Sequence, residues 1–74
     1  MLDYLLIRDG ARFYRVEVSY NLFGEYTVLR EWGARGRAGQ RALVWFSNLR
    51  EACKAAERWL KQAQRRGYAD LREA

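Results

Sequence analysis

Hydrophobic and polar residues alternate along several short stretches in the first two thirds of the chain. In residues 12–20 one face carries Tyr14, Val16, Val18 and Tyr20 and the other carries Arg15, Glu17 and Ser19, and this period of two is typical of a half-buried β-strand. The residues over 25–32 and 40–46 are also typical of strands, and 2–8 is expected to form a short strand or an extended arm. Because the connections between these segments are short, neighbouring strands are predicted to be antiparallel.

After the last of these strands the pattern changes to that of an amphipathic helix. Ser47 or Asn48 can cap its N-terminus, with Glu51 three residues after Asn48 as in a capping box, and Gly67 provides a stop after about Arg66. Apolar residues recur on one side of this segment and basic residues on the other. The predicted fold class is therefore α+β: an antiparallel sheet of about four strands with one long helix packed on it. Residues 1–74 are expected to form a single domain.

The composition is consistent with one small domain and excludes several kinds of catalytic and metal site. The chain has 74 residues, no histidine and one cysteine, so a Cys/His metal site, a catalytic histidine and an internal disulfide are all excluded. We therefore expect no cofactor and no enzyme activity. No run approaches the roughly 18 apolar residues that cross a bilayer, and the N-terminus has no signal-like segment. A cytoplasmic protein without a membrane partner is the expectation.

The charge balance points to an anionic partner. The formal net charge is +5, and arginine supplies all but two of the 14 basic residues. Arginine makes planar, two-pronged contacts with phosphate, whereas lysine acts more as a point charge. A small, basic, arginine-rich domain favours nucleic acid, although a soluble domain with a slightly positive surface would have the same composition.

The stretch 22–40 carries the most informative chemistry. A predicted strand ends at Trp32, and a loop over 33–39 follows with glycine at every third position. Trp32 is interpreted either as core or rim packing, or as a platform for a sugar or base. The glycines either satisfy turn geometry with positive φ, or expose backbone N–H groups to a phosphate.

Several arginines are predicted to gather around this loop, where only Glu31 opposes them: Arg30, Arg35, Arg37 and Arg41. Arg12 and Arg15, on the strand over 12–20, are expected to extend the same patch. The cluster is either a solvated surface or a set of phosphate contacts, and the neighbouring tryptophan favours phosphate contacts.

Between about Ala11 and Tyr68 the chain resembles the WGR domain family, and bacterial members especially. The resemblance rests on the order of several pieces, none specific alone: Arg12–Val18, Leu22–Tyr26, Val28–Gly33, then Gly36, Gly39 and Gln40, the helix positions Ala52, Ala56 and Lys61, and finally Gly67–Tyr68. The family is named for a Trp-Gly-Arg triplet, which here reads Trp32-Gly33-Ala34. It occurs in poly(ADP-ribose) polymerases activated by DNA damage, in bacterial regulator-like proteins and as stand-alone bacterial proteins.

The resemblance implies a fold and a set of roles. In the polymerases the domain is an antiparallel sheet flanked by a helix, and it binds DNA near a break. The motif tryptophan packs on a sugar at the DNA end and a basic residue meets the terminal phosphate, roles that fall on Trp32 and Arg12. A tail tyrosine lines the DNA site in some members, so Tyr68 either does the same or packs the tail. Ala34 replaces the arginine that relays activation between domains, so this relay is the part least expected here.

The sequence thus predicts a non-catalytic module that binds nucleic acid, with double-stranded DNA ends or nicks favoured and little sequence specificity. The residues expected to contact nucleic acid are Arg12, Arg30, Trp32, Gly33, Arg35, Arg37, Gln40, Arg41 and Tyr68. The alternative is a protein-interaction module or a homodimer that uses the same loop and the exposed surfaces and edges of the sheet.

Overall fold

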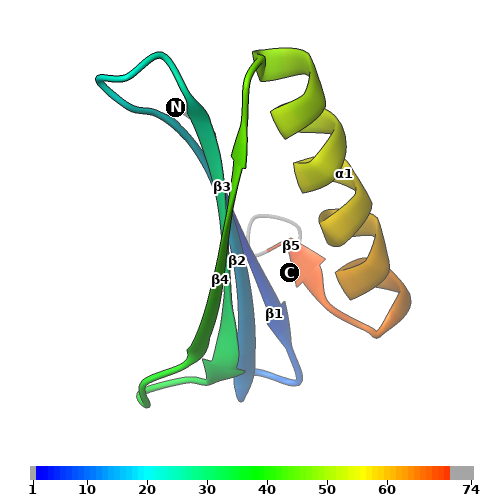
Figure 1. The fold of residues 1–74 in the computed structure, drawn as a ribbon. Coiled ribbons are helices and arrows are strands. Elements are labelled where there is room, and N and C mark those ends of the chain that lie inside the picture. The colour runs from blue at the N-terminus through cyan, green and yellow to red at the C-terminus, as the bar shows by residue number, and fades with distance from the viewer. Residues whose placement is uncertain (1, 71–74) are drawn as a thin grey trace.

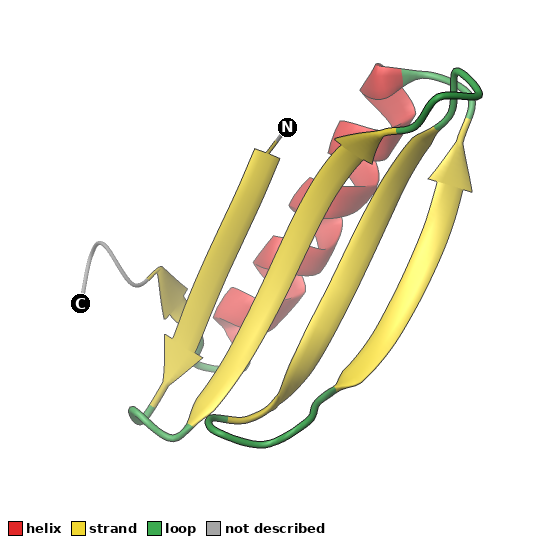
Figure 2. Ribbon diagram, turned by 90° about the vertical axis from the view of Figure 1, so that its left-hand side faces the viewer, coloured by secondary structure: helices red, strands yellow, loops and turns green. Residues whose placement is uncertain are grey.

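The computed structural model describes residues 2–70, which form one five-stranded antiparallel sheet with a single helix along one face (Figure 1). The strand order across the sheet is β4-β3-β2-β1-β5, as Figure 2 shows from the face that the helix leaves open. The elements are β1 (Leu2–Arg8), β2 (Arg12–Tyr20), β3 (Tyr26–Ala34), β4 (Gln40–Phe46), α1 (Leu49–Arg65) and β5 (Ala69–Asp70).

The α+β class is confirmed, with two corrections of detail. The sheet has five strands rather than about four, because Ala69–Asp70 pairs with Leu6 and Ile7 of β1. A two-residue strand has no periodicity for a sequence pattern to show. β3 also continues past Trp32 to Ala34, since Gly33 and Ala34 still pair with β2, so the loop is shorter than predicted.

The core lies between the sheet and the helix. The even-numbered residues of β2 from Tyr14 to Val18 are buried, as the alternation predicted, whereas Tyr20 is exposed near the strand end. The buried residues of α1 are all alanines: Ala52, Ala55, Ala56 and Ala63. Because alanine is small, the helix axis can come close to the sheet, and Val16, Val18 and Val28 become fully buried beneath it.

Both ends of α1 are capped as predicted. The Asn48 side chain accepts a hydrogen bond from the Glu51 amide at 2.9 Å. At the other end Gly67 has a φ of 96°, and the Tyr68 amide donates to the carbonyl of Ala63 at 3.1 Å. This turn returns the chain toward the sheet and buries Tyr68 at the C-terminal end of α1. Over residues 2–70, no helix has the length and apolar character needed to cross a membrane.

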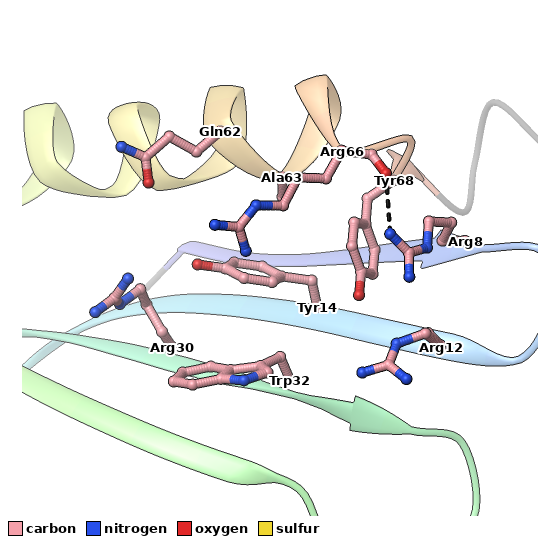
Figure 3. Close-up of a pocket in the computed structure, with 9 residues that line it drawn as sticks. All are labelled: Arg8, Arg12, Tyr14, Arg30, Trp32, Gln62, Ala63, Arg66 and Tyr68. Carbon is pink, nitrogen blue, oxygen red and sulfur yellow. Dashed lines mark hydrogen bonds between the residues drawn. The ribbon is translucent and has the colours of Figure 1, made fainter.

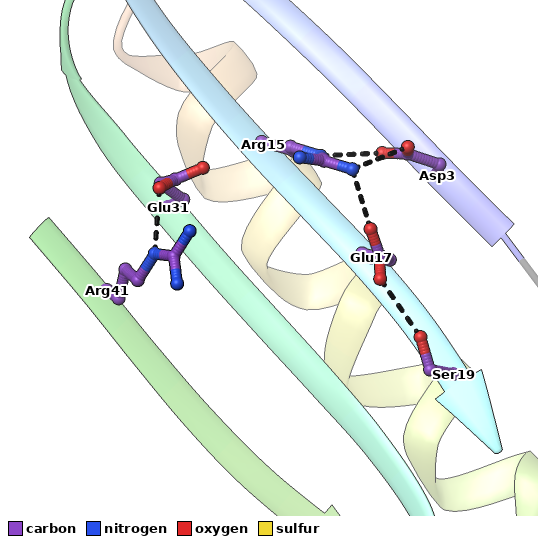
Figure 4. A network of polar contacts seen from close by, with 6 residues as sticks. All are labelled: Asp3, Arg15, Glu17, Ser19, Glu31 and Arg41. Atoms are coloured by element: carbon purple, nitrogen blue, oxygen red, sulfur yellow. Dashed lines mark hydrogen bonds and ion pairs between the residues drawn. The ribbon is translucent and has the colours of Figure 1, made fainter. Parts of the chain in front are cut away.

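The sheet face opposite the helix carries ion pairs between strands (Figure 4). Arg15 donates two hydrogen bonds to the Asp3 carboxylate, at 2.9 and 3.1 Å, and one to Glu17 at 2.7 Å. Arg41 donates to Glu31 at 2.9 Å. Arg15 was expected to extend the basic patch around the loop, and this prediction is wrong. Side chains alternate between faces along a strand, so Arg15 lies on the opposite face from Arg12, and two carboxylates neutralise it.

The ion pair of Asp3 predicts a dependence of stability on pH. Hydrogen bonding from Arg15 lowers the pKa of Asp3 below its usual value of 3.8. The pair therefore stabilises the fold above pH 3.8, and this contribution is lost as the pH falls through the lowered pKa. The wild type should unfold at slightly higher urea than Asp3→Asn at neutral pH, and the two should converge in strong acid. The effect is small because both side chains are partly exposed, and a difference independent of pH would contradict it.

Candidate nucleic-acid interface

A pocket of about 320 Å³ opens between the sheet and the C-terminal end of α1 (Figure 3). Strands β1, β2 and β3 form its floor, and the last turns of the helix and the segment after it form its other wall. The lining residues are Arg8, Arg12, Tyr14, Arg30, Trp32, Gln62, Ala63, Arg66 and Tyr68.

Strand register explains why these side chains meet. Leu6, Tyr14 and Trp32 are aligned across three adjacent strands, and Arg8 is directly opposite Arg12 across the β1–β2 hairpin. Antiparallel partners point to the same face of a sheet, and here that face is the one α1 covers. The pocket is therefore assembled by strand pairing among residues distant in sequence.

Three aromatic rings form a connected group in the pocket. Tyr14 and Trp32 are stacked with 6.2 Å between ring centroids and 20° between planes. Tyr68 meets Tyr14 edge to face at 5.8 Å. These contacts fix the plane of Trp32, a half-buried residue that packs against the core on one side and lines the pocket on the other.

Arg30 lies against two tryptophans. Its guanidinium carbon is 4.2 Å from the ring centroid of Trp59 on α1 and 5.7 Å from that of Trp32. The Nε atom of Arg30 is buried and has no hydrogen-bond partner among the described residues. The tryptophan faces stabilise the cation, while burial of the unpartnered N–H costs free energy.

Arg8 and Arg12 form the outer rim. Arg8 lies 5.0 Å from the centroid of the Tyr68 ring and donates to the Arg66 carbonyl at 3.1 Å, so it holds the turn after α1 against the sheet. Within residues 2–70, no ion pair or hydrogen bond engages the exposed Arg12 guanidinium. Arg12 is thus available to a ligand.

The described lining of the pocket is cationic. Four arginines line it, and no Asp or Glu is found among the described residues of the lining. Glu17 and Glu31, on β2 and β3, lie on the opposite face of the sheet with Arg15 and Arg41. Guanidinium groups around aromatic faces suit a ligand that combines phosphate with a sugar or base.

The structure separates the residues that the sequence analysis grouped. Arg12, Arg30, Trp32 and Tyr68 meet in the pocket. Gln40 is opposite Trp32 on β4, exposed and outside the pocket lining.

The prediction that four arginines gather around the loop is wrong for two of them. Arg30 lies under the helix on the face of Trp32, two positions away along β3. Arg41 lies on the opposite face, bound to Glu31. Side-chain alternation along β3 and β4 is the reason in both cases.

The other two arginines remain near the loop. The Arg35 side chain donates to the Gly10 carbonyl at 3.2 Å, and its amide donates to Ala11 at 2.9 Å. Arg35 therefore pins the loop to the β1–β2 turn. Arg37 is exposed, and its amide closes a turn on the Ala34 carbonyl at 3.3 Å. Two loop amides thus bond within the chain, which favours turn geometry over a phosphate cradle.

Gly33 does not line the pocket. It pairs with Phe13 in the sheet and lies against Gly39. Gly33 therefore allows the end of β3 and the loop to pack closely together. Gly36, with a φ of 80°, is the position in the loop that needs a left-handed conformation.

Sequence reasoning missed five pocket residues: Arg8, Tyr14, Gln62, Ala63 and Arg66. A signal for Arg8 existed, because the Asp9-Gly10 turn places Arg8 and Arg12 on one face of a hairpin. Nothing in the local pattern indicated that Arg66 returns to the sheet beside them.

Comparison with known proteins agrees with this architecture. The family model described as WGR domain matches residues 5–74. An uncharacterised protein of Sinorhizobium fredii (strain NBRC 101917 / NGR234), called y4dW, is 36% identical over 61 residues, which cover 82% of this chain and 30% of that protein. The chain thus spans less than a third of the length of this relative. No solved structure matches.

Proposed function

Because the chain belongs to the WGR domain family, whose members are in general nucleic-acid-binding modules, we propose that it is a non-catalytic module for double-stranded DNA. We propose further that it prefers ends or nicks and has little sequence specificity. The observation that carries this proposal is the pocket in which four arginines surround stacked aromatic rings with no carboxylate in the described lining.

A concave site of this kind favours an end over the middle of a duplex. Within a duplex, neighbouring base pairs cover the faces of the bases, and only the phosphates and groove edges are accessible. At an end the terminal sugar and base face are exposed, so a ring such as Trp32 can cover them while Arg12 and Arg30 reach the last phosphate. Contacts to phosphate and sugar position a protein on DNA but do not read its sequence.

The decisive experiment is a fluorescence anisotropy titration with a short duplex that carries a 5′-phosphate, in low and in moderate salt. An unlabelled closed circle and an unlabelled linear duplex then compete for the protein. We expect saturable binding that weakens as salt is added. The linear duplex should displace the labelled duplex more effectively than the circle does. Equal competition per base pair would remove the preference for ends, and the absence of binding in low salt would overturn the proposal as a whole.

Arg12→Ala should lower the salt dependence of DNA binding. Arg12 is exposed and engages no partner within the described residues, so its expected role is a phosphate contact. Removing one such contact should reduce the slope of log affinity against log salt by about 1. Arg58→Ala is the matched control, because Arg58 is an exposed arginine on α1 outside the pocket lining. An equal change of slope in both variants would indicate general charge attraction instead of a pocket contact.

A further inference from the structure

The outer edge of β4 is an unprotected strand edge. β4 pairs with β3 on one side, and among residues 2–70 no strand or loop pairs with its other side (Figure 2). An edge strand presents unpaired N–H and C=O groups, and proteins usually protect such an edge with lysine, proline or a bulge. β4 has seven residues, Gln-Arg-Ala-Leu-Val-Trp-Phe, with neither lysine nor proline, and each of them is paired in continuous register with β3.

The side chains of this edge are also unusually apolar for an open surface. Leu43 is 45% exposed and Trp45 is 56% exposed, and both lie on the sheet face that α1 does not cover. The one charge on β4 is Arg41, which Glu31 of the adjacent strand neutralises at 2.9 Å. The edge therefore combines free backbone groups with apolar surface and little net charge, which are the features of a strand-pairing site.

We propose that β4 pairs antiparallel with β4 of a second copy of the chain, centred on Leu43. In this register Leu43 is opposite the partner's Leu43, Arg41 is opposite the partner's Trp45, and Ala42 is opposite the partner's Val44. Each copy then places its guanidinium beside the indole of the other, and this contact occurs twice by symmetry. The sequence of β4 is complementary to itself when it is reversed, and that self-complementarity identifies the occupant as a second copy.

The register also avoids the usual penalties of such pairing. Like charges directly opposite each other destabilise a strand pair, but the two copies of Arg41 are separated here by the central leucines. Glu31 remains next to Arg41 on its own chain. Association costs translational and rotational freedom, and two domains of net charge +5 also repel each other. Added salt screens that repulsion, so salt should strengthen this association while it weakens binding to nucleic acid.

Antiparallel pairing of two sheet edges keeps the same face of each sheet on the same side. Both helices, and with them both arginine pockets, would then lie on one side of a continuous ten-stranded sheet built from two five-stranded ones. Two pockets facing one way can bind one nucleic acid together, which raises the apparent affinity through effective concentration. The pairing itself does not depend on what the pocket binds.

Sedimentation velocity over a wide range of protein concentration tests the pairing, with variants that report on the register. The wild type should shift from 8.8 kDa toward twice that mass as concentration rises. Leu43→Lys and Leu43→Glu place like charges opposite each other at the centre, so each alone should associate at least about tenfold more weakly. An equimolar mixture of the two should recover association, because the central pair becomes Lys opposite Glu.

Leu5→Lys is the matched control, since Leu5 is a leucine of similar exposure on the same sheet face but on β1. It should associate like the wild type, and circular dichroism should show that all variants are folded. A wild type that stays monomeric at every concentration would overturn the proposal. So would equal weakening by Leu5→Lys, or a mixture of the two Leu43 variants that fails to recover, because either result would place the contact away from the β4 centre.

Discussion

Trp32→Ala is expected to weaken binding to a phosphorylated duplex end by about tenfold to a hundredfold and to change binding to closed circular DNA much less. Stacking of a base on an aromatic side chain contributes roughly 1–3 kcal/mol. An exposed terminal sugar or base face exists only at an end, so the loss should fall on ends. The closed circle would still be attracted by the arginines of the pocket rim.

The environment of Trp32 explains why the effect should be large. The ring is fixed by Tyr14 on the adjacent strand and approached by the Arg30 guanidinium at 5.7 Å. A platform that is already held in position loses little conformational freedom when a ligand binds. Alanine removes the platform and also releases Arg30 from one of its two tryptophan partners.

Two further variants separate loss of the platform from loss of the fold. Trp32→Phe keeps an aromatic plane and should retain most of the preference for ends. Phe23→Ala removes a ring that is 86% exposed at the β2–β3 turn, outside the pocket lining, and should bind DNA like the wild type. Because Trp32 also packs against the core, thermal unfolding must confirm that each variant is folded at the binding temperature. An equal loss on ends and circles, or no loss, would exclude the platform role.

Much of the fold could be predicted from the sequence. The period of two in 12–20 identified the buried face of β2, and the Asn48 and Gly67 signals placed both ends of α1. Local patterns suffice there, because a strand face and a helix cap are determined by residues within a few positions of one another. The same alternation, applied to β3 and β4, would also have separated Arg30 from Arg41.

The pocket was less accessible to sequence reasoning because it depends on pairing between distant segments. Arg8, Arg12 and Arg66 meet only after the β1–β2 hairpin has formed and the helix has returned its C-terminal end to the sheet. Arg66 and Arg8, for example, are 58 positions apart in the sequence. No periodicity within one element records such a contact.

The position of Ala34 shows how the pocket differs from the family motif. Ala34 pairs with Arg12 at the end of β3, whereas Arg35 turns to the Gly10 carbonyl. The triplet therefore supplies no guanidinium to the pocket in this chain. The positive charge at that end comes from Arg12 and Arg8 on the neighbouring hairpin, which is why a departure in the motif is compatible with a basic pocket.

Gly39→Ala is expected to destabilise the fold by about 3 kcal/mol, the upper end of the usual cost of overpacking. A Cβ atom at this position would lie 2.5 Å from the Trp32 carbonyl oxygen and 2.9 Å from Cζ of Phe13. The first of these atoms belongs to the backbone of β3, so a change of rotamer cannot relieve the contact. Either the loop or the end of β3 must move, and the end of β3 carries Trp32.

Gly36→Ala is the informative comparison, because it separates steric contact from backbone conformation. Gly36 has a φ of 80°, but an added Cβ would meet nothing within 4 Å, so alanine should cost only about 1–2 kcal/mol for the left-handed conformation. Urea unfolding should therefore rank the wild type above Gly36→Ala and Gly36→Ala above Gly39→Ala. The reverse order of the two variants would show that loop conformation, and not the approach of the loop to Trp32, limits stability. With the expected order, Gly39→Ala should also lose affinity for DNA ends, since relief of the contact displaces the strand end that positions the tryptophan.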